Sequence, residues 1–336
     1  MSESVAAVVV TYNRSQLLLE CLDALLRQTR PLDKIVLIDN ASTDGTAEIL
    51  AARGYLKHAV IDYVRLPNNT GGAGGFHEGV KRAFETGFDW FWLMDDDAEP
   101  YHDALERMEP MFARDGIAGV ANLAVTAAGL PDLEHRGWLA LRGTTPRAHR
   151  PIEATGLDRE LEISFASFVG LAVHRTAVER VGLPKRELFI KGDDLEYCMR
   201  LSILGPIMLV PQSRIVNKDG LVGTLVPCTR FGRTSYRVPF DKLWLSYFSL
   251  RNLTWIRRRH CGPMVAATFA LRQYSRQIVG ILLYDSERLV RLGFFAHAIS
   301  DAWLGVFDND KPKRLTRRQT PGSSPGPLKR DGHAES

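Results

Sequence analysis

Residues 90–97 read WFWLMDDD, an apolar run that ends in three adjacent aspartates. The first five side chains are too apolar for a surface loop, so they predict a buried strand. Asp95, Asp96 and Asp97 repel one another strongly unless a cation lies among them. In an extended segment Asp95 and Asp97 point to the same side, and their oxygen atoms suit Mg²⁺ or Mn²⁺ bridged to a pyrophosphate. The alternative is a solvated acidic turn.

The segments before this run alternate between strand-like and helix-like patterns. Strands are expected at residues 5–11, 35–39 and 60–66, and helices at residues 16–28, 46–52 and 76–86. This alternation is typical of a parallel sheet with covered faces, so the predicted fold class is α/β with a mostly parallel sheet. Further along, the pattern predicts an apolar run at 165–173, helices at 176–181 and up to about 204, and a mostly helical stretch at 241–307.

Polar clusters follow four of the expected strands. They are Thr11–Arg14, Asp39–Asn40, Asn68–Asn69 and Asp95–Asp97. Ligands of open α/β sheets bind at the carboxyl ends of the strands. We therefore expect these four clusters to meet at one edge of the sheet and to form a single binding site.

A glycine-rich stretch, NTGGAGGF, occupies residues 69–76. We expect a loop that precedes the helix at 76–86, because glycine permits close backbone approach and leaves free N–H groups to face a phosphate or sugar. No Gly-Lys-Ser/Thr follows, so the stretch is not a nucleotide-triphosphatase phosphate loop. A flexible hinge is the alternative interpretation.

A second acidic group, Asp193–Asp194 with Glu196, stands at the start of an expected helix. A carboxylate can take a proton from an attacking hydroxyl and so act as a general base. Acidic residues in the first turn of a helix also stabilise the helix dipole, which is the alternative role.

The composition is that of a soluble globular protein, with 336 residues, 45% hydrophobic and 24% charged. No long uninterrupted apolar run predicts a spanning helix, and the first residues do not predict a signal peptide. Four scattered cysteines without CxxC spacing argue against a zinc site or disulfide framework and favour a reducing cytoplasm. From residue 227 onward Lys and Arg outnumber Asp and Glu by 19 to 8, whereas acids prevail before it by 31 to 24.

The order of three motifs resembles family 2 glycosyltransferases of GT-A fold. The motifs are VVVTYNR at 8–14, IDNASTDGT at 38–46 and DDD at 95–97, and the resemblance covers about residues 5–220. The stretches 69–76 and 189–197 (FIKGDDLEY) look closest to bacterial galactofuranosyltransferases, and related rhamnosyltransferases share much of the pattern. The resemblance implies an inverting, single-displacement transfer from a UDP- or dTDP-linked sugar.

The resemblance also implies roles for individual residues. Those that would line the nucleotide and donor-sugar pocket are Thr11, Asn13, Arg14, Asp39, Asn68, Gly72, Gly74, Phe76, Trp92 and Asp96. Asp95 and Asp97 would bind Mg²⁺ or Mn²⁺. Asp194 matches the position of the catalytic base, with Asp193 as the second choice. Where the family often has a metal-binding histidine this chain has Asn217, and Asp219 is the nearby alternative.

The domain boundaries follow from these patterns. Residues 1–225 are expected to form the GT-A catalytic domain, 226–308 a helical region and 309–336 a disordered basic tail. The helical region interleaves aromatic and basic residues, which suits a membrane surface and a lipid-linked pyrophosphate acceptor reached from the cytoplasm. Packing on the catalytic domain or a homo-oligomer interface is the equal alternative, and no nucleic-acid recognition motif is present.

The sequence leaves three functions open. The first is transfer of galactofuranose from UDP-galactofuranose to a saccharide or polyprenyl-pyrophosphate-linked acceptor in cell-surface polysaccharide synthesis. The second is rhamnose transfer from a dTDP-linked donor. The third, prompted by Asn217, is a nucleotide-sugar-binding protein without turnover.

Overall fold

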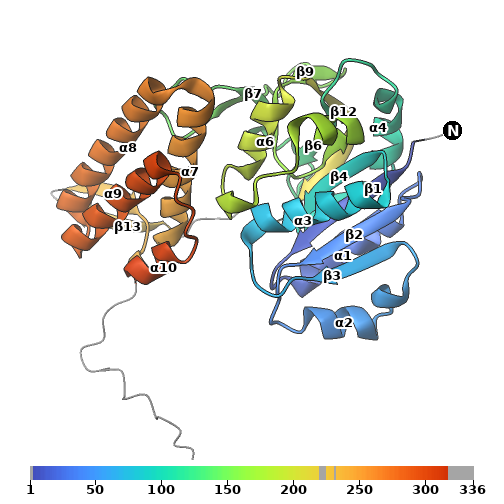
Figure 1. Ribbon diagram of the computed structural model, residues 1–336, viewed down its shortest axis with the longest axis horizontal. Helices are drawn as coiled ribbons and strands as arrows, with labels where there is room; N and C mark the ends of the chain where they lie inside the picture. The colour runs from blue at the N-terminus through green and yellow to red at the C-terminus, as the bar shows by residue number, and fades with distance from the viewer. Residues whose placement is uncertain (1–2, 219–224, 231, 317–336) are drawn as a thin grey trace, which may run out of the picture.

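The computed structural model describes residues 3–218, 225–230 and 232–316. Two parts lie side by side, one built around a sheet and one built from helices near the C-terminus (Figure 1). In the described part of the chain, no helix is long and apolar enough to cross a membrane. Asp219 lies outside the described residues.

The first half of the main sheet is parallel, as predicted. Its strands are β1 (Val5–Thr11), β2 (Lys34–Asp39), β3 (Ile61–Arg65) and β4 (Trp90–Asp95), in the spatial order β3-β2-β1-β4. The connecting helices are α1 (Ser15–Leu26), α2 (Thr46–Ala52) and α3 (Gly71–Thr86). β1 pairs with both β2 and β4, so the strand ends that carry Thr11, Asp39 and Asp95 lie on neighbouring strands.

The second half of the sheet is mixed. It contains β5 (Ala98–Pro100), β6 (Gly119–Val125), β9 (Leu161–Ile163), β11 (Leu171–His174) and β12 (Ile207–Asn217), in the order β4-β11-β6-β12-β5 with β9 beside β12. β11 runs antiparallel to both β4 and β6. A separate small sheet holds β7 (Arg136–Leu139), β8 (His149–Pro151) and β10 (Phe165–Ala166). The helices of this half are α4 (Ala104–Phe112), α5 (Arg175–Val181) and α6 (Asp193–Leu201).

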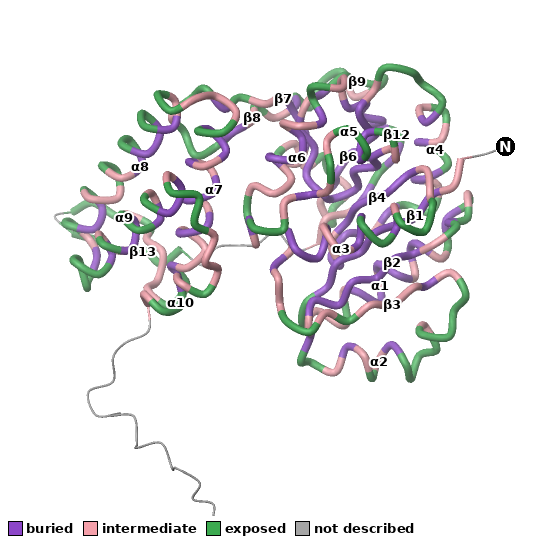
Figure 2. The backbone as a smooth tube through the Cα atoms, in the orientation of Figure 1, coloured by how far each residue is buried: buried purple, intermediate pink, exposed green. Residues whose placement is uncertain are grey.

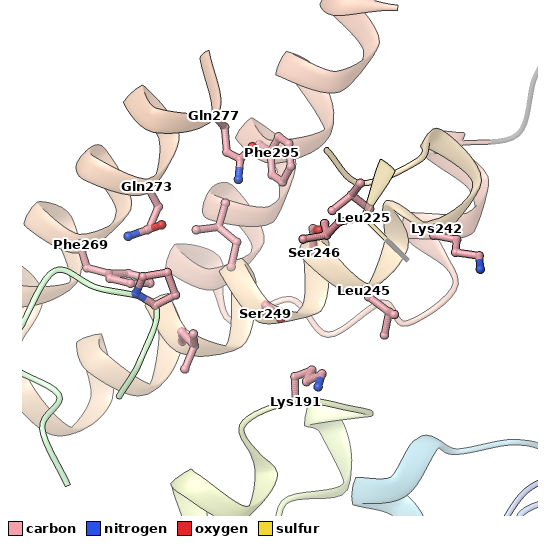
Figure 3. Close-up of a pocket in the computed structure, with 14 residues that line it drawn as sticks. Lys191, Leu225, Lys242, Leu245, Ser246, Ser249, Phe269, Gln273, Gln277 and Phe295 are labelled. Atoms are coloured by element: carbon pink, nitrogen blue, oxygen red, sulfur yellow. The ribbon is translucent and has the colours of Figure 1, made fainter. Parts of the chain in front are cut away.

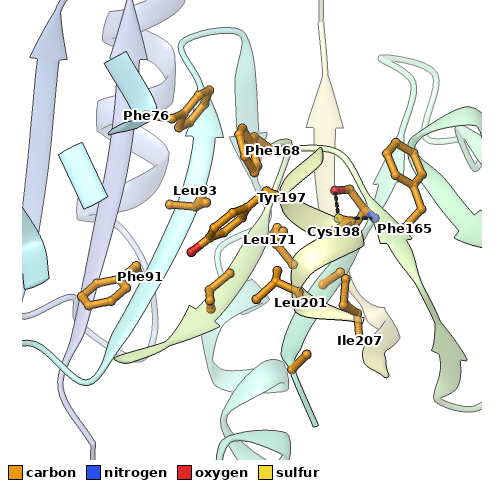
Figure 4. Packing of buried hydrophobic residues seen from close by; sticks show 14 of the residues in the cluster. Phe76, Phe91, Leu93, Phe165, Phe168, Leu171, Tyr197, Cys198, Leu201 and Ile207 are labelled. Carbon is orange, nitrogen blue, oxygen red and sulfur yellow. Dashed lines mark hydrogen bonds between the residues drawn. The ribbon is translucent and has the colours of Figure 1, made fainter. Parts of the chain in front are cut away.

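Alternating side chains of β1 divide the interior into two cores. Val5, Ala7 and Val9 join a core with α1 and α4, and their neighbours on the opposite face join a second core with α3, α5 and α6. The strands are the most continuously buried part of the chain (Figure 2). Figure 4 shows the second core, where the ring centroids of Phe76 and Phe168 are 4.6 Å apart. This core connects α3 to the loop beside β11.

The glycine-rich stretch is helical, so the predicted loop before residue 76 is wrong. Helix α3 begins at Gly71 and includes every glycine of the stretch. A Cβ atom at Gly75 would lie 2.4 Å from Val10 Cγ1, and one at Gly79 would lie 2.3 Å from Val8 Cγ1. The glycines therefore allow the helix to pack directly on β1, and this close packing is the physical reason for their position.

The C-terminal part begins with a hairpin that the sequence did not predict. The strands β13 (Val226–Arg230) and β14 (Arg233–Arg237) precede α7 (Trp244–Cys261), α8 (Pro263–Tyr284) and α9 (Arg288–Leu304). Residues 311–316, expected to be disordered, form the short helix α10 (Lys311–Thr316). Lys311 Nζ lies 2.7 Å from Asp301 Oδ1 and Asn309 accepts hydrogen bonds from Arg251, so this segment is held against α7 and α9. Residues 317–336 lie outside the described residues.

Candidate functional site

A cavity of about 520 Å³ opens at the carboxyl ends of β1 and β4. It brings together polar side chains from the strand ends, the start of α3, the loop before α6 and the end of β12. The lining residues predicted from the sequence are Thr11, Arg14, Gly72, Phe76, Asp95, Asp96, Asp97, Asp193, Asp194 and Asn217. Each of the four strand-end clusters predicted from the sequence therefore contributes to the cavity, the second through Asn40 and the third through Asn69.

The three aspartates have different partners. Asp96 is buried and accepts a hydrogen bond of 2.7 Å from Thr11 Oγ1. Asp97 pairs with the Arg14 guanidinium at 2.6 Å, and the same guanidinium lies 3.6 Å from Asp96. Burial raises the pKa of Asp96 to about 6, against the opposing effect of the Thr11 hydrogen bond. Arg14 thus supplies positive charge at the place where a diphosphate would need it.

The carboxylates fit a divalent cation. Burial, followed by the charge of Asp97, raises the pKa of Asp95 well above its usual range, and a cation would remove this penalty. Within residues 3–218, 225–230 and 232–316, no three His, Cys, Asp or Glu side chains form a complete metal site. Mg²⁺ often takes one or two carboxylates and completes its shell with substrate phosphates and water. Asp95 and Asp97 therefore suit an ion that arrives with a diphosphate.

The predicted base stands in the first turn of α6, directly after a conformationally unusual loop. Phe189 and Lys191 both have positive φ, of 64° and 70°, before α6 begins at Asp193. Burial raises the pKa of Asp193, and the neighbouring charge of Asp194 raises it further. Burial also raises the pKa of Asp194, while the Leu195 N–H and the Lys191 charge oppose that shift. Both carboxyl groups line the cavity, so both can reach a bound hydroxyl.

A histidine that sequence reasoning missed stands beside Asn217. His135, from the 3₁₀ turn Leu133–His135, lines the cavity and has its Nε2 2.9 Å from Asn217 Nδ2. Its Nδ1 lies 2.8 Å from Ser167 Oγ. Burial, then the charge of Arg136, lowers the pKa of His135 to about 4, so its ring is neutral. Nothing in the local sequence indicates this position, because the irregular stretch at 125–160 carries no recognisable motif.

Several predicted donor-binding residues do not line the cavity. Asn13 binds the Thr43 backbone N–H at 2.7 Å, and Asn68 is exposed next to the lining residue Asn69. Gly74 is buried within α3. Asp39 is fully buried and accepts 2.7 Å hydrogen bonds from Tyr63 and the Ser42 N–H. Trp92 lies in the core on the other face of the sheet, where its Nε1 donates to Asn122. Their part in donor binding therefore stays a prediction.

Comparisons with known proteins identify chains of similar sequence. Residues 6–182 match the family described as glycosyl transferase family 2. Galactofuranosyltransferase GlfT1 of Mycolicibacterium smegmatis is 29% identical over 60% of this chain and 66% of the relative. The GlfT1 of Mycobacterium tuberculosis H37Rv is 31% identical over 60% of this chain and 65% of the relative. The match thus spans just under two thirds of the length of these relatives.

Solved structures share the fold. GalNAc-T7 with UDP, GalNAc and Mn²⁺ superposes with a TM-score of 0.61 at 14% identity, over 93% of this chain and 58% of the other. Residues 1–349 of S. aureus TarS, in complex with UDP, give a TM-score of 0.54 at 15% identity over 94% and 93% of the two chains. At these identities the likeness concerns the fold, which is the predicted GT-A type with an additional helical region.

Proposed function

This chain belongs to glycosyl transferase family 2, and from that premise we propose that it moves galactofuranose from UDP-galactofuranose onto a saccharide or lipid-linked acceptor, with inversion. The single observation that carries the proposal is the meeting of Asp95–Asp97 and Asp193–Asp194 in one cavity. One acidic group suits the donor diphosphate with its cation, and the other suits the acceptor hydroxyl. The relatives named galactofuranosyltransferase support the choice of sugar.

The donor side is formed by strand-end residues. A divalent cation held by Asp95 and Asp97 would neutralise charge on the departing diphosphate, which lowers the barrier to its release. Arg14 adds a fixed positive charge beside them, 2.6 Å from Asp97. Thr11 holds Asp96 in place, so that this carboxylate can face the ribose or sugar. The Mn²⁺ bound in the structural neighbour GalNAc-T7 supports Mn²⁺ or Mg²⁺ as the ion.

The acceptor side is formed by the loop before α6. Asp194 takes the proton from the acceptor hydroxyl as that oxygen attacks the anomeric carbon, and Asp193 is the second choice for this role. Burial raises the pKa of both groups, which makes either a stronger base than an ordinary aspartate once it is ionised. Attack from the side opposite the diphosphate gives inversion in one step.

The acceptor and the cellular location belong to the same proposal. The basic helical part and the cavity between its helices support a lipid-linked acceptor that this enzyme meets at the inner face of the cell membrane. The contact is peripheral. Transfer of rhamnose from a dTDP-linked donor is the competing reaction, and binding without turnover is the competing function.

One experiment separates these possibilities. Thermal unfolding is followed with UDP-galactofuranose and with dTDP-rhamnose, each with Mn²⁺, and product formation is then measured with a galactofuranosyl-accepting glycolipid. We expect stabilisation and transfer with UDP-galactofuranose, both abolished by EDTA. Preference for dTDP-rhamnose would replace the proposed sugar, and metal-dependent binding without product would favour the binding protein. No thermal stabilisation and no product with either donor would contradict the proposal.

A further inference from the structure

A second cavity, of about 430 Å³, lies in the helical part of the molecule. Helices α7, α8 and α9 form most of its wall, and Figure 3 shows their side chains around the space. The apolar lining includes Val238, Leu245, Leu250, Leu253, Phe269 and Phe295. No carboxylate is among the described residues that line it. The other polar residues of the lining are Lys191, Lys242, Ser246, Ser249, Gln273 and Gln277. The cavity is therefore suited to a largely apolar molecule that carries an anionic group, and not to a cation.

The cavity adjoins the candidate active site through Lys191. This residue lines both spaces, and in Figure 3 it reaches the second cavity from the catalytic part, opposite α7. Lys191 is also close enough to Asp193 and Asp194 for its charge to lower the pKa of each. A phosphate group at Lys191 would thus lie between the apolar cavity and the predicted base.

The wall on the side of the catalytic part is fixed by hydrogen bonds. Gln273 Nε2 donates to the Thr144 carbonyl at 2.7 Å, and the buried Arg257 guanidinium donates to the Thr145 carbonyl at 3.0 Å. Pro146, next in the chain, lines the cavity. Because α7, α8 and the segment at residues 144–146 are joined by these hydrogen bonds, the cavity is formed before a ligand enters, which lowers the entropic cost of binding.

We propose that this second cavity binds the chain of an isoprenyl diphosphate, with the diphosphate at Lys191 and the sugar that it carries at Asp193–Asp194. The inference rests on the proposed function and assigns the acceptor class to a specific site. Apolar walls match the hydrocarbon, the lysine matches the anionic head, and the shared residue orients the molecule towards the site of transfer. Because Lys191 is close to Asp193 and Asp194, only a few sugars fit between the diphosphate and the reacting hydroxyl of the acceptor.

Direct binding tests this assignment without any requirement for transfer. Titration calorimetry uses the whole chain, with excess UDP and Mn²⁺ to occupy the donor cavity, and the probes are farnesyl diphosphate, farnesol and inorganic diphosphate. We expect farnesyl diphosphate to bind at least about tenfold more tightly than either partial probe, because it alone makes both the apolar and the ionic contact. Equal affinity for farnesol, or the absence of binding, would overturn the inference.

Two matched substitutions locate the site. Ser249→Trp fills the cavity from α7 and should weaken farnesyl diphosphate binding about tenfold or more, whereas Ser275→Trp on the exposed face of α8 should leave it unchanged. Lys191→Gln should weaken the diphosphate probe and not farnesol. Arg276→Met, in a neighbouring cavity that shares Gln273 and Gln277 with this one, should change neither. Loss of affinity in the Arg276 variant instead would overturn the proposed orientation.

Failure of the inference is distinguishable from failure of the proposed function. If Ser249→Trp abolishes probe binding and the wild-type chain transfers no galactofuranose, the cavity assignment holds and the donor proposal fails. If the wild-type chain transfers galactofuranose to a short soluble acceptor and Ser249→Trp leaves probe affinity intact, the donor proposal holds and the cavity assignment is wrong.

Discussion

At the scale of single residues, the site gathers negative charge in a place with little water. Asp95, Asp96 and Asp193 all have pKa values raised mainly by burial. Such carboxylates are stable as anions only with partners. Thr11 and Arg14 contact Asp96, Arg14 also pairs with Asp97, and the charge of Lys191 opposes the pKa shift of Asp193. The remaining negative charge is what a divalent cation, bound together with a diphosphate, would balance. The unusual feature of the sequence, three adjacent aspartates, thus has a physical counterpart in the fold.

The raised pKa of the predicted base gives a pH dependence. A base acts only when ionised, and its raised pKa means that the ionised form is lost as pH falls, before an ordinary aspartate with a pKa of about 3.9 would be protonated. We expect kcat/KM at saturating metal to fall on the acid side with a midpoint above that value. The measurement is the initial transfer rate across pH, with UDP binding followed in parallel. A rate that stays flat down to about pH 4 would contradict the assignment.

At the scale of elements, helix α7 holds the loop that leads into α6 and the predicted base. Asn252 is fully buried, and its Nδ2 donates to the carbonyls of Leu188, Ile190 and Lys191 at 2.9, 3.0 and 2.8 Å. The remaining carbonyl of this run, that of Phe189, accepts from the Ala73 N–H of α3 at 3.1 Å. These bonds hold a backbone with two positive φ values that glycine would adopt more easily. The helical part therefore contributes to the geometry of the candidate active site.

Removal of the Asn252 side-chain amide should lower the rate of transfer without an equal loss of donor affinity. Asn252→Ala removes three hydrogen bonds to this loop and lets it relax, so we expect kcat to fall about tenfold or more while UDP affinity changes less than about twofold. Thr254→Val is the matched control on the same helix, because the buried Thr254 hydroxyl has no hydrogen-bond partner among the described residues. Equal losses in both variants would indicate a general effect on α7 and contradict the positioning role.

The packing of α3 on β1 gives a stability prediction. Gly79→Ala places a methyl group 2.3 Å from Val8 Cγ1, and overpacking of this kind costs about 1–3 kcal/mol, more than the gain of about 1 kcal/mol in helix propensity. We expect a net loss in the free energy of unfolding. Gly72→Ala is the control, since nothing lies within 4 Å of its Cβ position. Chemical denaturation of both variants measures the difference, and a stabilised Gly79→Ala protein would contradict the account.

At the scale of the whole molecule, the exposed face of α8 is apolar and flanked by positive charge. Leu271 and Val279 are 71% and 58% exposed, and Leu289 at the start of α9 is 85% exposed. Arg272 and Arg276 are exposed beside them. Helices with this combination lie on anionic lipid surfaces. The same face could instead bind a second copy of the chain, and the two possibilities differ in their response to lipid charge.

Vesicle flotation distinguishes these two partners. We expect the protein to float with vesicles that contain anionic lipid and not with neutral vesicles, with binding reduced by added salt. Leu271→Glu with Leu289→Glu should reduce flotation several-fold, whereas Ser275→Gln should not. A stable oligomer that dissociates in the Glu variant, without any flotation of the wild-type protein, would contradict the membrane contact.

How far the sequence predicts this molecule depends on the kind of signal. Strands β1 to β4 are predictable because buried parallel strands leave continuous apolar runs, and their ends mark the site. The start of helix α3 at Gly71 is not predictable from the sequence, because glycine lowers helix propensity. Only the close approach of α3 to β1 explains why the helix contains these glycines. β12 has no regular pattern, since its pairing with β6 shifts register between Val210 and Arg214.

The same limit applies to the candidate site. Asp95 and Asp194 stand in recognisable motifs, so their presence at the cavity is predictable. His135 and Asn252 come from segments without motifs, and only tertiary contacts bring them to the site. Trp92 shows the opposite error, because its place beside the aspartates does not reveal that its side chain faces the other core. The position of Trp92 just before the aspartates predicts that it lies in a strand, and does not predict which face of the sheet its side chain occupies.

The measurement that tests the central claim most directly is galactofuranose transfer by Asp194→Asn, compared with the wild-type protein and with the surface variant Asp115→Asn. We predict that Asp194→Asn retains UDP affinity within about twofold and loses transfer by about a hundredfold or more, while Asp115→Asn behaves as the wild type does. Wild-type rates in the Asp194 variant would contradict the claim that this cavity performs the transfer with Asp194 as its base.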